Sequence, residues 1–381
     1  MSCNKIQIVC DGRLEYFRKV ELGVRNYGFS TGNFVFADRW LPEDLRNAKR
    51  LAKLQGIDGI IALIGDRKVA RRFAQIGVPV VNVSNSIGDR LFPLVTQDDE
   101  MVGEIAARHL LERGCASLAF WGEPGISYSD QRQKGFLKYA RTHPSNCPVS
   151  CNGSRVGAPY LETVDRMTLW LRPLPRPVGV FATLDTLALL VMRAAREEKW
   201  HVPDEIAVLG AGDDDFWVEH DSVPLSSIRL PSRKIGYAAG EMLHQLLSHR
   251  ALPIHSTRLP VSEIAERQST DRRKVVDPAV ARAIAFIEQH ACRNPYLEEI
   301  ARAAGISRSS LQKRFQFQFK CSPLEEVRRV RIRRAQEFLR RTNVKMDVVA
   351  ERTGFPNSQA FSVQFRNLTA LTPMGYRRQF T

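Results

Sequence analysis

The chain has 381 residues, of which 44% are hydrophobic, and a formal net charge of +15. This length exceeds what one hydrophobic core usually organises, so we expect two or three domains. The seven cysteines are scattered and odd in number, which excludes a disulfide framework or CxxC zinc pairs and favours a reducing cytosol. No apolar run reaches 18 residues and the first run is too short for a signal peptide, so we expect a soluble intracellular protein.

The positive charge is concentrated near the C-terminus. Residues 271–381 contain 22 Lys and Arg against 10 Asp and Glu, an excess of 12, whereas residues 1–270 contain 34 against 31. A basic segment of this kind commonly binds a polyanion, and nucleic acid is the commonest one. We therefore expect residues 271–381 to bind nucleic acid, the alternative being a merely solvated basic face.

From Lys5 to about Ile264, short apolar runs alternate with amphipathic stretches. Each run is continuous and rich in Val and Ile, as strands buried on both faces are. The runs are KIQIVC, GIIALIG, VPVVNVS, SLAFWG, VGVFAT and EIAVLGA. Residues 99–113 and 233–248 carry apolar side chains at helical spacing. This alternation predicts α/β architecture with parallel sheets, which place ligands at the carboxyl ends of their strands.

Enzyme motifs are missing from this region, which has no GxGxxG after a strand, no GxxxxGK[ST], no GxSxG and no HExxH. Polar residues do follow several strands, among them Asp11, Ser84, Asp185 and the triplet at 213–215. Adjacent residues of an extended segment point to opposite faces, so the triplet cannot converge on one metal ion. We expect no metal and no cofactor. An enzyme stays open as an alternative, with Asp98 and Asp213 as its acid–base pair.

The character of the sequence changes after Ile264. Residues 269–277 are polar and charged and predict a linker, and the chain from Pro278 onward is predicted to be helical. Residues 297–315 and 346–368 share an apolar-Ala pair followed by a glycine, Gly305 in one and Gly354 in the other. A glycine at this place permits the sharp turn of a helix-turn-helix. The pair of motifs predicts two DNA-binding units.

A long basic helix is predicted between the two units, over residues 322–341, with seven arginines. Ser322 as N-cap, Pro323 in the first turn and Glu325 three residues after the cap form a capping box. Its predicted apolar side consists of Leu324, Val327, Val330 and Phe338. A rigid helix would hold two recognition helices about 34 Å apart, the spacing of successive major-groove faces.

Each recognition helix is predicted to begin at a capping residue, Ser307 in the first unit and Asn357 in the second. The side chains expected to face inward are Leu311, Phe315, Phe361 and Phe365. The side chains expected to face DNA are Arg308, Ser309, Gln312 and Lys313 in the first unit, and Ser358, Gln359, Ser362 and Arg366 in the second. Gln suits adenine and Lys suits guanine, whereas Arg308 is expected on phosphate.

The closing segment GFPNSQAFSVQFRNLTALTPMGYRR resembles the signature of AraC-type transcription regulators. The resemblance covers about residues 278–381, and it departs at Leu371, where many members have Gly. It rests on Ala350, Gly354, Phe355, Phe361, Phe365, Thr372, Pro373, Tyr376 and Arg377. The stretch ERQSTDRRKVVDPAVARAI is similar to the xylose-responsive members of the family. The resemblance implies a two-lobed, periplasmic-binding-protein-like sensor in residues 1–268 and an all-α domain of two helix-turn-helix units in 278–381.

The first domain is similar to the LacI-type effector domain over residues 98–114, 128–136, 181–189 and 202–213. In that family an Arg three residues before Gly-Phe grips the sugar, which implies this role for Arg132, and the strand-end Asp corresponds to Asp185. Tyr16 and Arg18 stand where relatives line the cleft. Asp213 is the last candidate ligand contact. Two positions depart from the family pattern.

The departures are Leu184, where relatives commonly have Asn, and Gly212, where they have the sugar-binding Asp. The triplet thus begins one residue late, and Asp213 reaches the cleft only if Gly212 loosens the backbone. Trp121, Tyr128 and Trp217 are candidates to stack on a sugar ring, although aromatic residues at strand ends more often belong to the core.

These observations predict a DNA-binding transcription regulator, not an enzyme, controlled by a monosaccharide such as xylose. A different small ligand, or a sensor that only dimerises the chain around an inert cleft, stays open. The resemblance implies a cytoplasmic, nucleoid-associated homodimer that binds double-stranded promoter DNA. RNA polymerase is a further candidate partner, and no membrane partner is expected.

Overall fold

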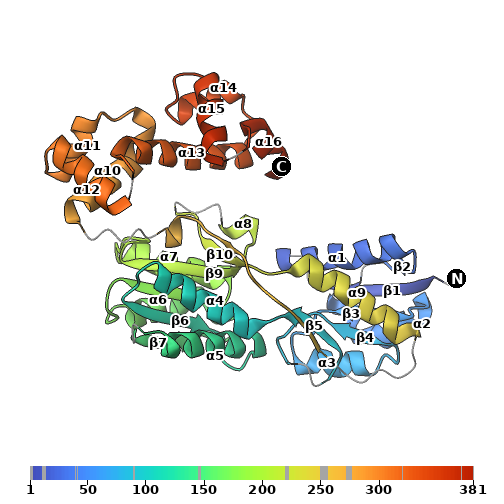
Figure 1. The fold of residues 1–381 in the computed structure, drawn as a ribbon. Helices are drawn as coiled ribbons and strands as arrows, with labels where there is room; N and C mark the ends of the chain where they lie inside the picture. The colour runs from blue at the N-terminus through green and yellow to red at the C-terminus, as the bar shows by residue number, and fades with distance from the viewer. Residues whose placement is uncertain are drawn as a thin grey trace. The chain divides into compact units, whose positions relative to one another are not determined.

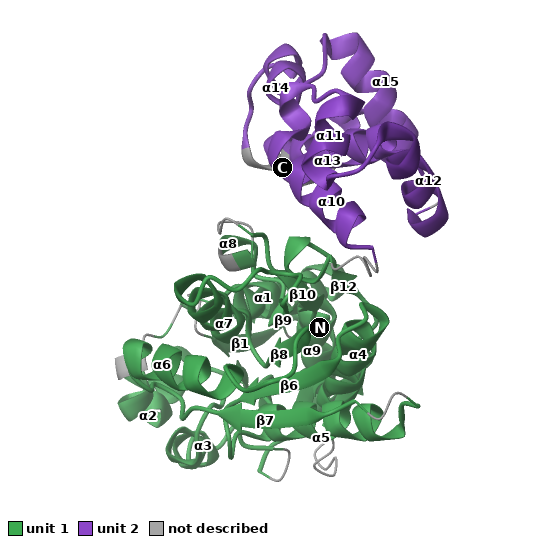
Figure 2. Ribbon diagram, turned by 90° about the vertical axis from the view of Figure 1, so that its left-hand side faces the viewer, with its two compact units in different colours: residues 1–273 green, residues 274–381 purple. Residues whose placement is uncertain are grey.

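The computed structural model of the chain describes residues 3–10, 14–38, 40, 42–88, 91–144, 147–218, 223–248, 256–271, 277–319, 321–369 and 371–380. The chain divides into two compact units, residues 1–273 and 274–381 (Figure 2). Asp11 and residues 272–276 of the predicted linker lie outside the described residues. Within the described chain, no helix combines the length and the apolarity needed to cross a bilayer.

The first unit contains two lobes, each built on a six-stranded sheet (Figure 1). The strand order is β11-β5-β4-β3-β1-β2 in one sheet and β12-β10-β9-β8-β6-β7 in the other. Every described strand pair is parallel except β10 with β12, which is antiparallel. The predicted α/β class with parallel sheets is therefore confirmed.

The first sheet consists of β1 (Asn4–Val9), β2 (Phe34–Phe36), β3 (Gly59–Ala62), β4 (Val80–Asn82), β5 (Leu94–Gln97) and β11 (Ser256–Leu259). The second consists of β6 (Ser117–Gly122), β7 (Val149–Gly153), β8 (Val178–Ala182), β9 (Ile206–Gly212), β10 (Ser226–Arg229) and β12 (Ile264–Ala265). The six apolar runs in the sequence became β1, β3, β4, β6, β8 and β9. The buried strands β5 and β10 escape a search for apolar runs because they contain Thr, Gln and Ser.

Helices cover both sheets. Around the first lie α1 (Glu15–Thr31), α2 (Ala48–Gln55), α3 (Arg67–Ala74) and α9 (Ser232–Ser248). Around the second lie α4 (Asp99–Glu112), α5 (Ser127–Thr142), α6 (Tyr160–Leu171), α7 (Asp185–Glu197) and the single turn α8 (Asp215–Val218). Glycines bring two helix pairs into backbone contact, because a Cβ on Gly236 of α9 would lie 1.9 Å from the Val20 carbonyl oxygen of α1. A Cβ on Gly135 of α5 would likewise lie 1.9 Å from the Glu100 carbonyl oxygen of α4.

The chain passes between the two lobes three times. The crossings follow β5, β10 and β11 in the sequence. The carboxyl ends of strands from both sheets therefore approach a common region, which is where parallel sheets bind ligands.

The described residues of the second unit form helices and the turns that connect them. Its helices are α10 (Pro278–His290), α11 (Leu297–Ala304), α12 (Arg308–Phe319), α13 (Pro323–Arg341), α14 (Met346–Arg352), α15 (Ser358–Thr369) and α16 (Pro373–Phe380). The pairs α11–α12 and α14–α15 are the two predicted helix-turn-helix units, and α13 runs between them (Figure 1). The predicted capping box of α13 is confirmed, since Ser322 Oγ accepts from the Glu325 N–H at 3.2 Å and the Glu325 carboxylate accepts from the Ser322 N–H at 2.5 Å.

Helix α13 contributes to two hydrophobic cores. Val327 and Val330 belong to the core of the first helix-turn-helix, and Ile332, Ala335 and Leu339 to that of the second. Leu324 is exposed, contrary to its predicted place on the apolar side. The reason is helical spacing. Pro323 lies one turn before Val327 on the same face of the helix and is buried, whereas Leu324 lies beside that face.

Candidate ligand cavity and DNA-binding helices

A cavity of about 350 Å³ lies between the two lobes of the first unit. Residues of the first lobe that line it are Leu14, Tyr16, Phe17, Leu63, Ser84, Asn85, Ser86 and Gln97. Those of the second lobe are Tyr128, Arg132, Leu184, Asp185, Thr186, Ala211, Gly212, Asp214 and Leu230. The volume lies within the range of about 300–1,000 Å³ typical of small-molecule sites, and such sites combine apolar walls with a few convergent polar groups.

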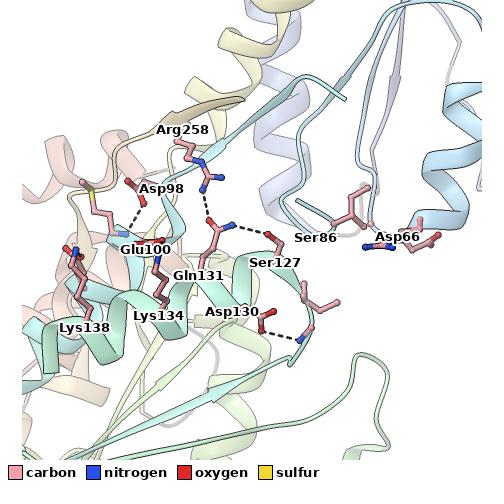
Figure 3. Close-up of a pocket in the computed structure, with 17 residues that line it drawn as sticks. Asp66, Ser86, Asp98, Glu100, Ser127, Asp130, Gln131, Lys134, Lys138 and Arg258 are labelled. Atoms are coloured by element: carbon pink, nitrogen blue, oxygen red, sulfur yellow. Dashed lines mark hydrogen bonds and ion pairs between the residues drawn. The ribbon is translucent and has the colours of Figure 1, made fainter. Parts of the chain in front are cut away.

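A larger groove of about 1160 Å³ lies on the surface beside α4 and α5 (Figure 3). Its lysines are paired, since Lys134 Nζ lies 2.5 Å from a Glu100 carboxylate oxygen and Lys138 Nζ lies 2.6 Å from one of Glu104. Gln131 accepts a hydrogen bond from Arg258 Nη1 at 2.6 Å. These pairs join the two helices and the two lobes to each other, so the smaller cavity between the lobes is the candidate ligand site.

Arg132 projects from α5 into the wall of the cavity and is 2% exposed. Its Nε donates to Asp99 Oδ1 at 2.9 Å, and its Nη1 donates to the Thr183 carbonyl oxygen. The Tyr128 ring centroid lies 5.2 Å from the guanidinium carbon. The guanidinium is thus held in one orientation by a carboxylate, a carbonyl and an aromatic face.

Asp99 is the centre of a buried polar network. Besides Arg132, it accepts hydrogen bonds from Asn85 Nδ2 at 2.7 Å and from Gln97 Nε2 at 2.8 Å. The Tyr16 hydroxyl donates to Gln97 Oε1 at 3.2 Å, and burial raises the pKa of Tyr16. This network contains residues of both lobes. Nothing in the local sequence pattern predicts Asp99, Asn85 or Gln97 as members of the site.

Asp185 is the first residue of α7 and also lines the cavity. Its Oδ1 accepts from Ser227 Oγ at 2.5 Å, and its Oδ2 accepts from the Asp214 backbone N–H at 3.1 Å. Burial raises the pKa of Asp185 from 3.8 to about 6, although the hydrogen bond from Ser227 lowers it. Leu184 and Gly212, the two departures from the LacI-like pattern, are cavity-lining positions as well.

Asp213 does not line the cavity, in contrast to its predicted role as a ligand contact. Its carboxylate accepts from Arg229 Nε at 2.8 Å and from Arg267 Nη1 at 2.7 Å. The backbone explains the difference, because Gly212 has φ +139° and Asp213 itself has φ +53°, so the chain turns at this point. Arg18 also lies outside the lining residues, because it is two residues after Tyr16 in a helix and faces another side.

The other two aspartates of the triplet bond to the opposite lobe. Asp214 lines the cavity, and its Oδ2 accepts from the backbone N–H of Glu15 at 3.2 Å. The Asp215 N–H in turn donates to Glu15 Oε2 at 2.7 Å. Glu15 is the first residue of α1 in the first lobe. Asp214 and Asp215 therefore join the two lobes.

Arg267 belongs to the connecting segment, residues 264–271, which precedes the second unit in the chain. Here Ser269 Oγ donates to the Val208 carbonyl oxygen at 2.6 Å, and Thr270 Oγ1 lies 2.9 Å from His109 Nε2. Burial is the main reason that the pKa of His109 falls from 6.5 to about 4. Ser269 and Thr270 were expected in the linker, but they are fully buried in the first unit because their hydroxyls have these partners.

The aromatic candidates for stacking occupy different environments. Tyr128 lines the cavity, and its hydroxyl donates to Glu123. Trp121 is fully buried in the core of the second lobe, where its ring centroid lies 5.3 Å from that of Trp170. The side chain of Trp217 lies outside the described residues. Tyr128 is thus the one of the three that the structure places at the cavity.

The first recognition helix, α12, has the predicted orientation. Leu311 and Phe315 are fully buried, and the four predicted DNA-facing residues are all exposed. Ser307 Oγ accepts from the Ser310 N–H at 3.3 Å, which confirms the predicted cap. Arg308 forms an ion pair with Glu298 of α11, so this arginine is held beside the start of the recognition helix.

The second recognition helix, α15, is rotated slightly from the expected orientation. Phe361 and Phe365 are fully buried, and Asn357 Oδ1 accepts from the Ala360 N–H at 2.7 Å as the predicted cap. Gln359 and Arg366 are exposed, whereas Ser358 and Ser362 are partly buried. At 100° per residue these two serines lie beside the phenylalanine stripe. The exposed face therefore passes through Gln359 and Arg366.

Three family models match the chain. The periplasmic binding proteins and sugar binding domain of the LacI family matches residues 24–150, a periplasmic binding protein-like domain matches 107–270, and a helix-turn-helix domain matches 300–379. The xylose operon regulatory protein of Escherichia coli K12 is 27% identical over 383 residues, 98% of this chain and 97% of that protein. The protein of the same name from Haemophilus influenzae is 28% identical over 84% of this chain and 85% of its own length.

Solved structures of xylose-binding and LacI family regulators are similar to the chain as well. The structure described as the xylose-binding transcription activator covers 100% of this chain and 99% of its own, with a TM-score of 0.79 and 25% identity. A ribose-bound LacI family regulator from Enterococcus faecium shares the fold over 71% of this chain and 100% of its own, with a TM-score of 0.57 and 20% identity. The chain is therefore a DNA-binding transcription regulator that is similar over its full length to the xylose operon regulators, with a periplasmic-binding-protein-like domain followed by a helix-turn-helix domain.

Proposed function

We propose that the first unit binds a monosaccharide, D-xylose or a related pentose, and that the bound sugar changes how the helix-turn-helix units bind promoter DNA. The buried pair of Arg132 and Asp99 beside the cavity carries this proposal. A guanidinium held in one orientation presents its remaining N–H donors to neighbouring hydroxyls of a sugar. The full-length similarity to xylose operon regulators supports a pentose.

The ligand contacts that we propose are Arg132, Asp185 and Tyr16 from the sequence, together with Asp214 from its place in the cavity wall. Leu184 adds an apolar surface for the C–H groups of the ring. The DNA contacts that we propose are Arg308, Ser309, Gln312 and Lys313 in α12, and Gln359 and Arg366 in α15, with Ser358 and Ser362 at the margin of that face.

The aspartate triplet supports a route from the cavity to the connecting segment. Ser227 Oγ donates to Asp185 and also accepts from the Asp213 backbone N–H at 3.0 Å. Asp213 in turn binds Arg267 of the connecting segment. A sugar that contacts Asp185 or Asp214 differently in two lobe arrangements would therefore change the pairing at Arg267, which is the differential interaction that coupling between sites requires.

We further propose that the chain is a cytoplasmic, nucleoid-associated homodimer that contacts RNA polymerase at its promoters and catalyses no reaction. The known functions of the relatives support regulation rather than catalysis. The two carboxylates of the enzyme alternative also have other partners: Asp98 accepts from the Met101 N–H at 3.0 Å as the cap of α4, and Asp213 binds two arginines.

Calorimetry of the full chain with D-xylose, L-arabinose, D-ribose and D-glucose tests the ligand. We expect one pentose to bind, and Tyr16→Phe to weaken it by about 1–3 kcal/mol because a hydroxyl of the buried network is lost. Tyr160→Phe, at an exposed tyrosine, is the matched control and should bind as the wild type does. No binding of any sugar, with DNA affinity independent of sugar, would favour a non-sugar effector or an inert cleft.

The coupling route has a separate test. Asp213→Asn removes the charge that binds Arg267 but leaves the cavity lining intact. We expect the variant to bind the sugar as the wild type does, and to lose most of the sugar-dependent change in DNA affinity, measured by fluorescence anisotropy with and without sugar. An unchanged sugar response would rule out this route while leaving the ligand assignment in place.

A further inference from the structure

The two recognition helices bury equivalent residues. Helices α12 and α15 have 12 residues each, and each buries a pair of core residues four apart, Leu311 and Phe315 in one, Phe361 and Phe365 in the other. The shift between the helices is therefore 361 − 311, or 50 residues. By this shift Ser309 corresponds to Gln359, and Lys313 corresponds to Val363.

Val363 lies on the DNA-facing side of α15. It is 54% exposed and, within the described residues, is not part of the core around Phe361 and Phe365. Gln359 precedes it by four residues and Arg366 follows it by three, so all three side chains share one face of the helix. Both neighbours are exposed and polar. The centre of this polar face is thus occupied by an aliphatic side chain.

The chemistry of the major groove limits what such a side chain recognises. The base edges there present hydrogen-bond donors and acceptors, and a single apolar group, the C5 methyl of thymine. A valine side chain forms no hydrogen bond, so it discriminates among bases through contact with that methyl group. A lysine at the corresponding position of α12 instead donates to guanine O6 and N7.

We propose that Val363 reads the methyl group of one thymine in the DNA half-site bound by α15, whereas Lys313 reads guanine at the equivalent place in the half-site bound by α12. This inference rests on DNA binding by the helix-turn-helix domain and is independent of the ligand. The two DNA half-sites that one chain binds then differ in base composition, although the two helix-turn-helix motifs have the same fold. Promoter DNA recognised in this way has a defined direction.

Replacement of thymine by deoxyuridine, which lacks only the methyl group, tests the proposal. Operators are first selected from random DNA with the full-length protein, and each thymine is then replaced singly. We expect one replacement to weaken wild-type binding about fourfold, the effect of removing one methyl group from an apolar contact. The Val363→Ala variant should bind the thymine operator and the deoxyuridine operator equally, because it has lost the valine methyl groups that contact the thymine methyl group.

Lys313→Ala is the matched control, since it alters the equivalent position of the other helix. It should keep the full sensitivity to deoxyuridine and lose discrimination at a guanine instead. Circular dichroism should show that both variants are folded, as expected for exposed side chains. If Val363→Ala discriminates thymine from deoxyuridine at every position as the wild type does, Val363 does not read a thymine methyl group and the proposal is wrong.

Discussion

The two units of the molecule place their functional polar groups in opposite environments. In the first unit, Arg132 is 2% exposed and paired with the fully buried Asp99. In the second unit, Gln312, Lys313 and Gln359 stand on exposed helix faces. Breaking a buried pair leaves an uncompensated charge in the protein interior, whereas removing an exposed side chain leaves the fold unchanged. In the first unit the same buried pair therefore serves both folding and the proposed ligand binding, whereas in the DNA-binding domain the residues proposed to contact DNA are separate from the core.

The largest expected effect is on the buried pair. Asp99→Ala should lower the free energy of unfolding by about 3–5 kcal/mol in urea titrations, because Arg132 is left buried without its carboxylate. Glu100→Ala, at the next residue, removes the partly buried partner of the exposed Lys134 and should cost less than about 1 kcal/mol. Equal losses in the two variants would show that burial does not distinguish the two ion pairs.

The pH dependence of stability is the next largest effect, and two buried groups act in opposite directions. The pKa of Asp185 is raised from 3.8 to about 6. Its contribution to the free energy of unfolding is therefore present below pH 4 and is lost as the pH rises through 6. The pKa of His109 is lowered from 6.5 to about 4, so its contribution is present above pH 6.5 and is lost as the pH falls through 4. Each amounts to about 3 kcal/mol, because one pKa unit corresponds to about 1.4 kcal/mol.

The two contributions can be separated by substitution. Between pH 4 and 6.5, the stability of Asp185→Asn should rise more steeply with pH than that of the wild type, because the falling contribution is gone. The stability of His109→Gln should fall with pH relative to the wild type, because the rising contribution is gone. Parallel curves for all three proteins would show that folding does not shift the pKa of either group.

In the DNA-binding domain, we expect effects on affinity alone. Gln312→Ala should cost about 1–3 kcal/mol of binding free energy at one base position, and Arg308→Ala should weaken all sequences alike and reduce the salt slope by about 1. Binding isotherms of the full chain at several salt concentrations measure both effects. A loss of folding stability comparable to the loss of affinity would contradict the separation of folding from function in this unit.

The smallest expected effect concerns Leu184, which precedes α7 as its N-cap residue and forms no side-chain cap. Leu184→Asn should stabilise the protein by about 1 kcal/mol through a cap hydrogen bond. The same change adds a polar group to the cavity wall, so it should also strengthen sugar binding. Thermal unfolding with and without D-xylose measures both quantities. A destabilised variant would show that the leucine is retained for packing.

Local pattern in the sequence was sufficient for much of this architecture. Continuous apolar runs predicted six strands, because a strand buried on both faces needs such residues along its length. Gly305 and Gly354 marked both helix-turn-helix units, since both have positive φ angles that favour glycine. Arg132 and Asp185 were found by resemblance to the LacI-type domain, and both lie in the cavity wall.

Only the tertiary structure decided which polar groups are partners. Asp213 was predicted to face the ligand, but the turn after Gly212 directs it to Arg267, 54 residues later in the chain. Asp99, Asn85 and Gln97 form one network although their sequence neighbours show no common motif. The physical reason is the separation of the interacting residues along the sequence. Periodicity and capping depend on residues a few positions apart, whereas the pairing of buried charges depends on which distant segments the folded sheets bring together.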